Sequence, residues 1–509
     1  MKHLILIGLM IYSSALLFCQ KHDFIWLTGY PSELENPTSD TFGISIYDFN
    51  PDTSLRLINN QEIKIGFDFA NVSLCDTLGN LLFYSNGIQI NNAVHEIIEN
   101  GAEINEFDRY GYKAVQGILA LPHPKGNHIY AFLHGTGQNF VNGEIFIHMP
   151  YLWYSEIDMS KNEGLGAVTL RMDTLVNDTL AKGRLMAVKH GNGRDWWIIV
   201  EQLCPIDRCF NNEFVRLLLT PEGIRRFPNQ KIFRSFGTET GVGQAFFTPD
   251  GKYYISPNSV RVGDPHYLDI YDFDRCTGWM TNKGSINDMI VQDINDGGGG
   301  LSISPNSRFV YHILRQRIIQ YDLWASNIEA SAIKVAEYDG FLAPFPTYFF
   351  LGQLAPDGKI YINSANGTRY LHVIHNPNEK GLACNVEQHG ILLPTYNSFS
   401  LPNFPNYRLG AWEGSPCDTL SPISFTKQIV ANEVKFFPNP STGFLQLELE
   451  EDVPISQLEV RFYSLTGQLI QSLQGQNTFD LIHFSNGIYI ASVFINGQVV
   501  GREKIVVQR

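Results

Sequence analysis

Pro249-Asp250-Gly251-Lys252-Tyr253-Tyr254-Ile255 is the stretch from which the fold of the central region can be read, and Pro356-Asp357-Gly358-Lys359-Ile360-Tyr361-Ile362 repeats it further along the chain. An Asp-Gly pair supplies the positive φ angles that a tight turn between two strands requires. The aromatic and β-branched residues that follow favour a strand. Each stretch therefore predicts the turn and second strand of a β-hairpin.

Four further stretches place a turn of small residues before such a strand: residues 76–84, 124–132, 191–199 and 305–311. The six turns lie 47 to 67 residues apart, about 56 on average, slightly more than the ~40–50 residues of a four-stranded propeller blade. Residues 20–412 have the length of seven such units. This predicts an all-β fold, a seven-bladed β-propeller, with a seventh blade assembled from both ends, near residues 24–27 and near Leu401. A six-bladed ring and a sandwich of hairpins are the alternatives.

The composition is that of a folded, acidic protein. Hydrophobic residues make up 44% of the chain and charged residues 17%, which is typical of globular rather than disordered proteins. The net charge of −14 without a basic cluster makes a nucleic-acid partner a poor expectation. The chain has no P-loop, dinucleotide fingerprint, HExxH motif or serine-hydrolase elbow, so we predict no cofactor, no metal and no catalytic residue.

Residues 1–19 have the layout of a secretory signal peptide. A short basic start precedes an apolar run over residues 4–18, which is shorter than the ~20 residues needed to span a bilayer. We expect cleavage between Cys19 and Gln20. Lipidation of Cys19 is the alternative, although Phe18 is a large residue for a lipoprotein site. No later segment is long and apolar enough to span a membrane, so none is expected in the mature chain.

Export into an oxidising compartment would permit disulfides. Cys204 and Cys209 flank a short Pro-Ile-Asp-Arg loop, and this spacing predicts a bridge between them. The remaining cysteines cannot be paired from the sequence, because six cysteines allow 15 connectivities. Asp293-Ile294-Asn295-Asp296-Gly297 is similar to a calcium loop but lacks its later carboxylate, so an ordinary loop is expected.

A different kind of sequence follows residue 412. Residues 413–432 are rich in turn formers and predict a linker. In residues 433–509, Leu445, Leu447 and Leu449 alternate with polar residues, which indicates a half-buried strand. These last 77 residues predict a small, independent, Ig-like β-sandwich.

This terminal region contains Phe437-Pro438-Asn439-Pro440-Ser441-Thr442-Gly443, Thr466-Gly467, Gly487-Ile488-Tyr489 and Lys504-Ile505-Val506-Val507. In that order they resemble the C-terminal sorting domain of type IX (Por) secretion cargo. The sorting motif would comprise Pro438, Asn439, Pro440, Gly443, Gly467, Gly487, Tyr489 and Lys504. The resemblance implies that the type IX secretion machinery is a partner and that the protein is extracellular, either secreted or attached to the outer cell surface.

The central region, in stretches such as Leu185–Gly193 and Gln353–Tyr361, also resembles secreted WD40/YVTN-like propeller proteins that precede such domains, some of them called gliding-motility associated. That group implies a fold but no defined activity. Asp-Thr-Leu occurs four times and resembles the O-glycosylation acceptor of bacteria with this secretion system. The acceptors would be Thr77, Thr174, Thr179 and Thr419.

We therefore predict a non-catalytic binding or adhesion module for a glycan or a protein. An extracellular hydrolase or lyase is the alternative, and it would need a cluster of carboxylates or histidines at the mouth of the propeller channel. A structural part of a surface assembly is a third hypothesis. We expect His190 to be a packed or hydrogen-bonded turn histidine, with a site residue on the rim as the alternative. Trp153 and one of the adjacent Trp196 and Trp197 are candidates for stacking on a sugar, because neighbours on a strand face opposite sides.

Overall fold

The structure is a computed structural model, and it describes residues 20–31, 41–50, 55–105, 111–141, 144–181, 183–202, 209–238, 243–258, 266–288, 299–397, 399–419, 434–449, 454–464, 469–495 and 498–509. The chain divides into two compact units, residues 1–420 and 421–509. Within the described residues, the helical segments are short 3-10 turns, and none is long and apolar enough to cross a membrane.

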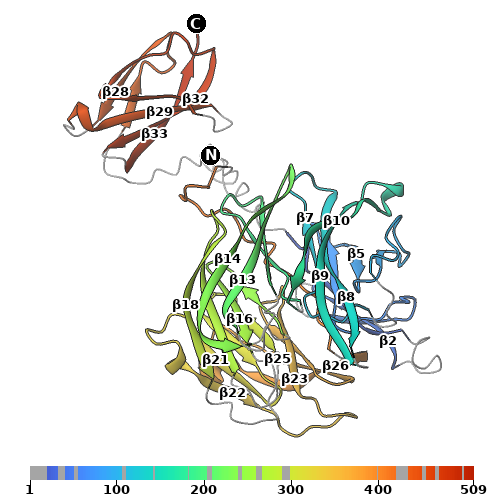
Figure 1. Cartoon of the computed structure of the whole chain (residues 1–509). Coiled ribbons are helices and arrows are strands. Elements are labelled where there is room, and N and C mark those ends of the chain that lie inside the picture. The colour runs from blue at the N-terminus through green and yellow to red at the C-terminus, as the bar shows by residue number, and fades with distance from the viewer. Residues whose placement is uncertain are drawn as a thin grey trace, which may run out of the picture. The chain divides into compact units, whose positions relative to one another are not determined.

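The first unit consists of antiparallel sheets that follow one another along the chain (Figure 1). Within the described residues there are seven such sheets. In chain order they are β1 (Ile25–Tyr30), β2 (Gly43–Asp48) and β3 (Arg56–Asn60); β4 (Val72–Cys75), β5 (Leu81–Ser85) and β6 (Ile90–Asn92); β7 (Ile118–Pro122), β8 (Ile129–Val141), β9 (Glu144–Asp158) and β10 (Ala167–Leu180); β11 (Met186–Lys189), β12 (Trp196–Glu201), β13 (Cys209–Thr220) and β14 (Gly223–Thr238); β15 (Phe246–Phe247), β16 (Tyr253–Asn258), β17 (His266–Asp274) and β18 (Trp279–Asp288); β19 (Gly300–Ile303), β20 (Phe309–Ile313), β21 (Arg317–Asp322) and β22 (Ile333–Glu337); and β23 (Phe349–Leu354), β24 (Ile360–Ser364), β25 (Thr368–Ile374) and β26 (Val386–Asn397).

These sheets close into a ring. The first strand of one sheet contacts the first strand of the next at β1 and β4, β4 and β7, β11 and β15, β15 and β19, and β19 and β23. The indole Nε1 of Trp196 donates to the carbonyl of Pro122 at 3.1 Å and joins the third and fourth sheets. Strand β26 then contacts β1 and β2, so the last sheet meets the first (Figure 1). Small sheets around a common axis are the arrangement of a β-propeller.

The repeated Pro-Asp-Gly-Lys stretches form the expected turns between the first and second strands of their sheets. The N–H of Gly251 donates to the carbonyl of Thr248 at 2.7 Å, and that of Gly358 to the carbonyl of Ala355 at 3.0 Å. Both glycines have a positive φ, 72° and 80°. Residues with an L side chain rarely adopt this backbone conformation, so the turn favours glycine there.

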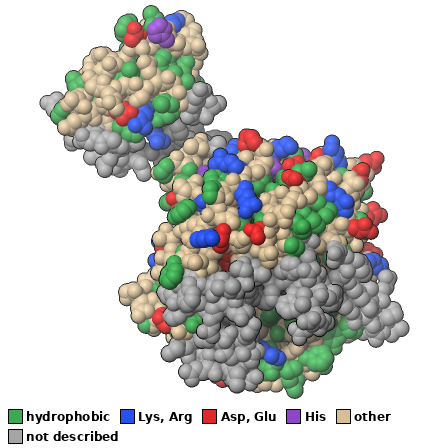
Figure 2. Space-filling view, in the orientation of Figure 1, with side chains coloured by type: hydrophobic (Ala, Val, Ile, Leu, Met, Phe, Trp, Pro, Cys, Tyr) green, Lys and Arg blue, Asp and Glu red, His purple; other side chains and the backbone are tan. Residues whose placement is uncertain are grey.

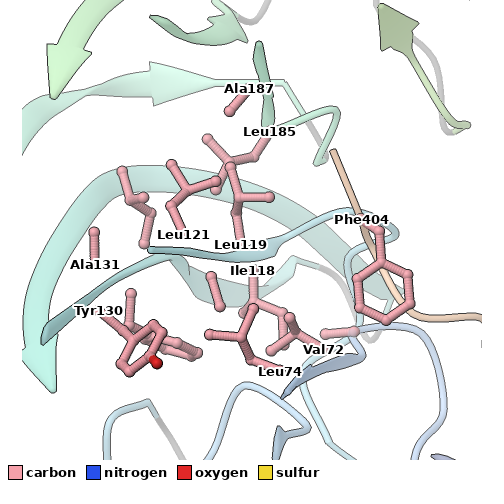
Figure 3. Packing of buried hydrophobic residues seen from close by; sticks show 14 of the residues in the cluster. Val72, Leu74, Ile118, Leu119, Leu121, Tyr130, Ala131, Leu185, Ala187 and Phe404 are labelled. Atoms are coloured by element: carbon pink, nitrogen blue, oxygen red, sulfur yellow. The ribbon is translucent and has the colours of Figure 1, made fainter. Parts of the chain in front are cut away.

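The ring is closed differently from the sequence prediction. Residues 399–412, here the central strap, form no strand among the described residues, and the first sheet consists of N-terminal strands alone. The Asn403 amide Nδ2 donates to the carbonyls of Ile118 and Leu185 at 2.9 and 3.0 Å. Figure 3 shows Phe404 beside the apolar cluster of the inner strands. Proline at positions 402 and 405 removes two backbone donors, which disfavours a strand ladder there.

A disulfide ties the start of the predicted linker to the first unit. A disulfide joins Cys276 to Cys417, with their Cα atoms 5.4 Å apart. Residues 413–417, assigned from the sequence to the linker, are therefore covalently attached to the ring. The sequence could not reveal this pairing, because 141 residues separate the two cysteines.

The second unit contains two antiparallel sheets. The first has the order β27 (Val434–Phe437), β28 (Phe444–Leu449) and β31 (Thr478–Asp480), and the second has the order β30 (Leu469–Gln474), β29 (Leu458–Ser464), β32 (Gly487–Ile495) and β33 (Gln498–Val507). Phe436, Phe462 and Phe479 are buried together. The predicted alternation in β28 is confirmed, with Leu445 and Leu447 buried, Leu449 half-buried, and the polar residues at 446 and 448 exposed.

Candidate functional site

A cleft of about 830 Å³ opens beside the fifth sheet of the ring, within the ~300–1,000 Å³ of small-ligand sites. Its walls come from the β15–β16 turn, the β17–β18 hairpin and the central strap. We call it the tryptophan cleft, and it is lined by Asp250, Gly251, Lys252, Asp272, Phe273, Asp274, Arg275, Thr277, Trp279, Thr281 and Trp412.

Strand alternation directs one face of the β17–β18 hairpin toward this cleft. Asp272 lies opposite Thr281 in the pairing register, and Asp274 lies opposite Trp279. These four side chains are at least partly exposed, whereas the intervening Met280 is buried on the other face. Two carboxylates, a hydroxyl and an indole therefore share one surface, because residues two apart on a strand point the same way.

Trp279 is held in place by contacts on one side of its ring. Its side chain is 53% exposed, and the guanidinium of Arg216 lies 4.8 Å from the ring centroid. The Nη1 of Arg216 also donates to the carbonyl of Gly278 at 3.2 Å. A Cβ at Gly278 would lie 2.7 Å from the Trp197 ring, so glycine is needed for the hairpin to approach the ring this closely.

Trp412 forms another wall and is 45% exposed. Its N–H donates to the carbonyl of Gly191 at 2.7 Å. The disulfide between Cys276 and Cys417 ties the chain just after Trp412 to the hairpin that carries Trp279. The sequence analysis did not identify either tryptophan, because neither lies in a repeated motif and only the folded chain brings them into one cleft.

The charged side chains of the cleft differ in the hydrogen bonds that they already make within the protein. The Asp250 carboxylate accepts from the Lys252 N–H at 3.0 Å, and the Asp274 carboxylate accepts from the Cys276 N–H at 2.8 Å, so both cap their own turns. Among the described residues, no hydrogen bond reaches the Asp272 carboxylate. Interaction with the Tyr253 side chain, and then the charges of Asp250 and Asp272, raise the pKa of Lys252 above its ordinary value.

Arg275 lines the cleft and hydrogen-bonds to the neighbouring backbone. Its Nε donates to the carbonyl of Lys189 at 2.8 Å and its Nη2 to the carbonyl of His190 at 3.3 Å. A third hydrogen bond reaches the carbonyl of Gly410 in the central strap. Burial lowers the pKa of Arg275 to about 10, against the opposing charge of Asp250, so this side chain remains a cation at neutral pH.

A smaller cavity of about 260 Å³ lies among the inner strands and the central strap. Among the described residues that line it, Asp23 supplies the carboxylate, and Nη1 and Nη2 of Arg408 lie 2.6 and 2.7 Å from its two oxygens. This ion pair occupies both carboxylate oxygens. The described lining contains no second carboxylate and no histidine.

The aromatic and histidine candidates from the sequence lie mostly in the core. Trp196 and Trp197 are both fully buried, so the expectation that one of them could stack on a ligand is wrong; neighbouring sheets cover both faces of β12. Trp153 is half-buried beside Tyr151, with ring centroids 6.0 Å apart. His190 is the expected turn histidine, since its Nε2 donates to the carbonyl of Cys276 at 3.1 Å.

The structure describes some of the predicted processing and modification sites, and the others lie outside the described residues. Thr77, Thr174, Thr179 and Thr419 are all exposed. Gln20 is exposed at the start of the described chain, and Cys19 lies outside the described residues. Cys204 and the side chain of Cys209 also lie outside them, as does the loop at residues 293–297. The bridge between Cys204 and Cys209 stays a prediction.

In the second unit, the predicted sorting residues gather around the last strand. The Asn439 Oδ1 accepts from the N–H of Val506 at 2.9 Å, and its Nδ2 donates to the carbonyl of Lys504 at 2.5 Å. Tyr489 and Gly487 lie opposite Ile505 and Val507 in the register. The remaining positions, Pro438, Pro440 and Gly443, surround Ser441, whose N–H donates to the carbonyl of Val506 at 2.7 Å. Gly467 lies outside the described residues.

Residues 435–508 match a protein family described as a secretion system C-terminal sorting domain. The second unit is a type IX sorting domain. The motif residues that resembled this family all lie within the matched range. A sorting domain of this type directs its protein to the cell surface or the extracellular space, and the type IX machinery handles it. Comparison of the chain with curated proteins finds no match.

Solved structures similar to the chain include a putative 6-phosphogluconolactonase from Bacteroides uniformis, at 10% identity over 74% of this chain and 98% of that one, with a TM-score of 0.36. The β-propeller domain of Myceliophteria thermophila Cps50 (Swd1) covers 64% of this chain and 88% of its own at 10% identity, with a TM-score of 0.34. The Nup133 β-propeller domain of Vanderwaltozyma polyspora covers 66% and 90% at 9% identity, with a TM-score of 0.36.

Proposed function

We propose that this protein is an exported, non-catalytic binding module, and that the tryptophan cleft is its binding site. The observation that carries the proposal is the pair of exposed indoles, Trp279 and Trp412, in one cleft of about 830 Å³. Each sheet of the first unit would be one blade of a seven-bladed propeller, and the sorting domain would be an Ig-like sandwich. The ligand would be a glycan or a protein of the outer surface.

The engagement of the cleft carboxylates favours binding over hydrolysis. A hydrolase or lyase needs positioned acid and base groups that can exchange protons with the substrate. Asp250 and Asp274 accept hydrogen bonds from their own turns, which leaves Asp272 as the carboxylate available to a ligand. One available carboxylate supports recognition of a ligand but not a two-carboxylate mechanism.

Charge distribution supports recognition of a specific ligand rather than general attraction to one sign of charge. On the face shown in Figure 2, Lys and Arg side chains lie scattered among Asp and Glu side chains. A single-sign patch would be the feature expected of electrostatic capture. The cleft, which combines apolar rings with a few charged groups, is the kind of site that selects by shape and hydrogen bonding.

Processing of the chain belongs to the same proposal. Cleavage between Cys19 and Gln20 would remove the signal peptide, and the exposure of Thr77, Thr174, Thr179 and Thr419 supports their glycosylation during export. The intact mass of the exported protein tests both. A mass equal to that of the bare chain from Gln20 would rule out the sugars, and a retained leader would rule out the cleavage.

Binding of the purified chain, without its leader, to the outer surface of the cells that export it tests the binding function. We expect saturable binding that falls at least about tenfold in the Trp279→Ala and Trp412→Ala variants, since exposed tryptophans dominate recognition sites. Trp324→Ala is the matched control, because Trp324 is 64% exposed and lies outside the cleft. Binding that is absent, or equal in all four proteins, would contradict the proposal.

A further inference from the structure

We propose that the tryptophan cleft takes an uncharged carbohydrate, a ligand that is rich in hydroxyl groups and presents apolar C–H faces. The inference rests on the proposed binding function and names the chemical class of its ligand. Trp279 and Trp412 offer ring faces on which such a ligand can stack. Thr277, Thr281 and Asp272 line the same cleft and can exchange hydrogen bonds with hydroxyl groups.

The charges of the cleft disfavour ions of either sign. Lys252 carries a raised pKa and remains protonated, and Arg275 is a buried cation. Both would oppose a cationic ligand such as a lysine-rich peptide. Asp250, Asp272 and Asp274 would oppose an anionic one. A neutral molecule whose hydroxyls both donate and accept avoids both conflicts, because each charged group can pair with a hydroxyl of the required polarity.

Comparison of repeated positions shows that Asp272 departs from the pattern of the ring. A Tyr-Asp pair recurs in three strands, at Asp48 in β2, Asp272 in β17 and Asp322 in β21. Asp48 is ion-paired with Arg56, and Asp322 lies 2.7 Å from Nη2 of Arg308. Asp272 has no such ion pair within the described residues. In two sheets an arginine forms an ion pair with the carboxylate, whereas in the sheet that forms the cleft the carboxylate is available to a ligand.

The same comparison identifies the residue that keeps the carboxylate available. Arg308 precedes Phe309 in the motif copy at residues 305–311, and Lys252 precedes Tyr253 at the equivalent place in the copy at residues 249–255. Arginine forms two parallel hydrogen bonds to a carboxylate, as Arg308 does at 3.0 and 2.7 Å. Lysine presents a point charge and cannot form this fork. A lysine at position 252 therefore leaves carboxylate oxygens open to ligand hydroxyls.

Contacts within the protein hold two walls of the cleft. Arg216 supports the Trp279 ring at 4.8 Å, and the disulfide between Cys276 and Cys417 fixes the strap that carries Trp412. Ordering of side chains on binding costs free energy, and walls that are already fixed avoid much of that cost. This suits a carbohydrate, whose individual contacts with a protein are weak.

An array of three probe classes tests the ligand class on the purified chain without its leader. The neutral probes are dextran, laminarin, mannan and xylan; the anionic probes are heparin and alginate; and the cationic probe is a lysine-rich peptide. We expect binding to at least one neutral probe, with a loss of at least about tenfold in Trp279→Ala and in Trp412→Ala and no loss in Trp324→Ala. Asp272→Asn should weaken the same binding about three- to tenfold, and Lys252→Arg should weaken it similarly by closing the ion pair.

The outcomes separate the ligand class from the binding function. Cleft-dependent binding to the anionic or cationic probes alone would overturn the carbohydrate and leave the binding module standing. If no probe is bound in a way that depends on Trp279 and Trp412, the carbohydrate is overturned, and the cell-surface assay decides the binding function separately. Circular dichroism of each variant, compared with that of Trp324→Ala, identifies any that fails to fold.

Discussion

Removal of the disulfide between Cys276 and Cys417 is the most informative perturbation of the first unit. The bond joins the β17–β18 hairpin to the end of the central strap, across 141 residues of chain. Replacing both cysteines by alanine releases this link and leaves the hydrogen bonds of the strap in place. We expect the ring to remain folded but to lose stability, and the cleft to lose affinity.

The size of the loss follows from the length of the loop that the bond closes. Cross-linking a chain lowers the entropy of its unfolded state, and the chain-entropy relation for 141 residues gives about 5 kcal/mol at 25 °C. Measured values for native disulfides reach this figure or fall below it, typically about 2–5 kcal/mol. We therefore expect the free energy of unfolding of the first unit to fall by about 2–5 kcal/mol.

Tryptophan fluorescence during urea unfolding measures this loss directly, because all seven tryptophans of the chain lie in the first unit. The two single variants, Cys276→Ala and Cys417→Ala, should each lose about as much as the double variant, since either removes the same bond. Reduction of the wild-type protein should give a similar loss. A double variant within about 0.5 kcal/mol of wild type would refute the reasoning.

The remaining predictions concern packing, the sorting domain and pH. A Cβ at Gly191 would lie 2.2 Å from the sulfur of Cys417, so Gly191→Ala should destabilise the wild type by about 1–3 kcal/mol in urea unfolding and much less when the disulfide is absent; equal losses in both backgrounds would contradict this. Asn439→Ala should lower the stability of the sorting domain in thermal unfolding by about 1–2 kcal/mol, because it removes two hydrogen bonds to the last strand. Thr442→Ala is the control and should have little effect, and equal losses in the two variants would disprove the role of Asn439. Burial lowers the pKa of His134 and of His372 to about 3. The unfolded chain binds these protons below pH 6.5, whereas the folded chain excludes them until about pH 3, so the free energy of unfolding should decrease by about 1.4 kcal/mol per pH unit for each histidine as the pH is lowered across this window. His134→Phe should remove one such contribution from the pH dependence of the urea midpoint, and an unchanged slope would count against it.

Local turn chemistry explains why the repeats could be recognised before the structure was known. Gly251 and Gly358 occupy turns whose positive φ excludes most other residues, so the Asp-Gly pairs identify the hairpins by themselves. The sorting domain was recognisable because the short sequence motifs that carry the resemblance lie within residues 435–508. The same approach failed for Trp196 and Trp197, because strand alternation indicates which face a residue occupies and not whether a neighbouring sheet covers that face.

The sequence by itself determined the repeating hairpins, the acidic composition and the sorting domain, because turns, strands and motifs depend on residues close together in the chain. Only the tertiary structure decided how the ring closes, that Cys276 pairs with Cys417, and that Trp279 and Trp412 share a cleft. These features join segments more than a hundred residues apart, and the positions of such segments depend on the packing of the whole ring.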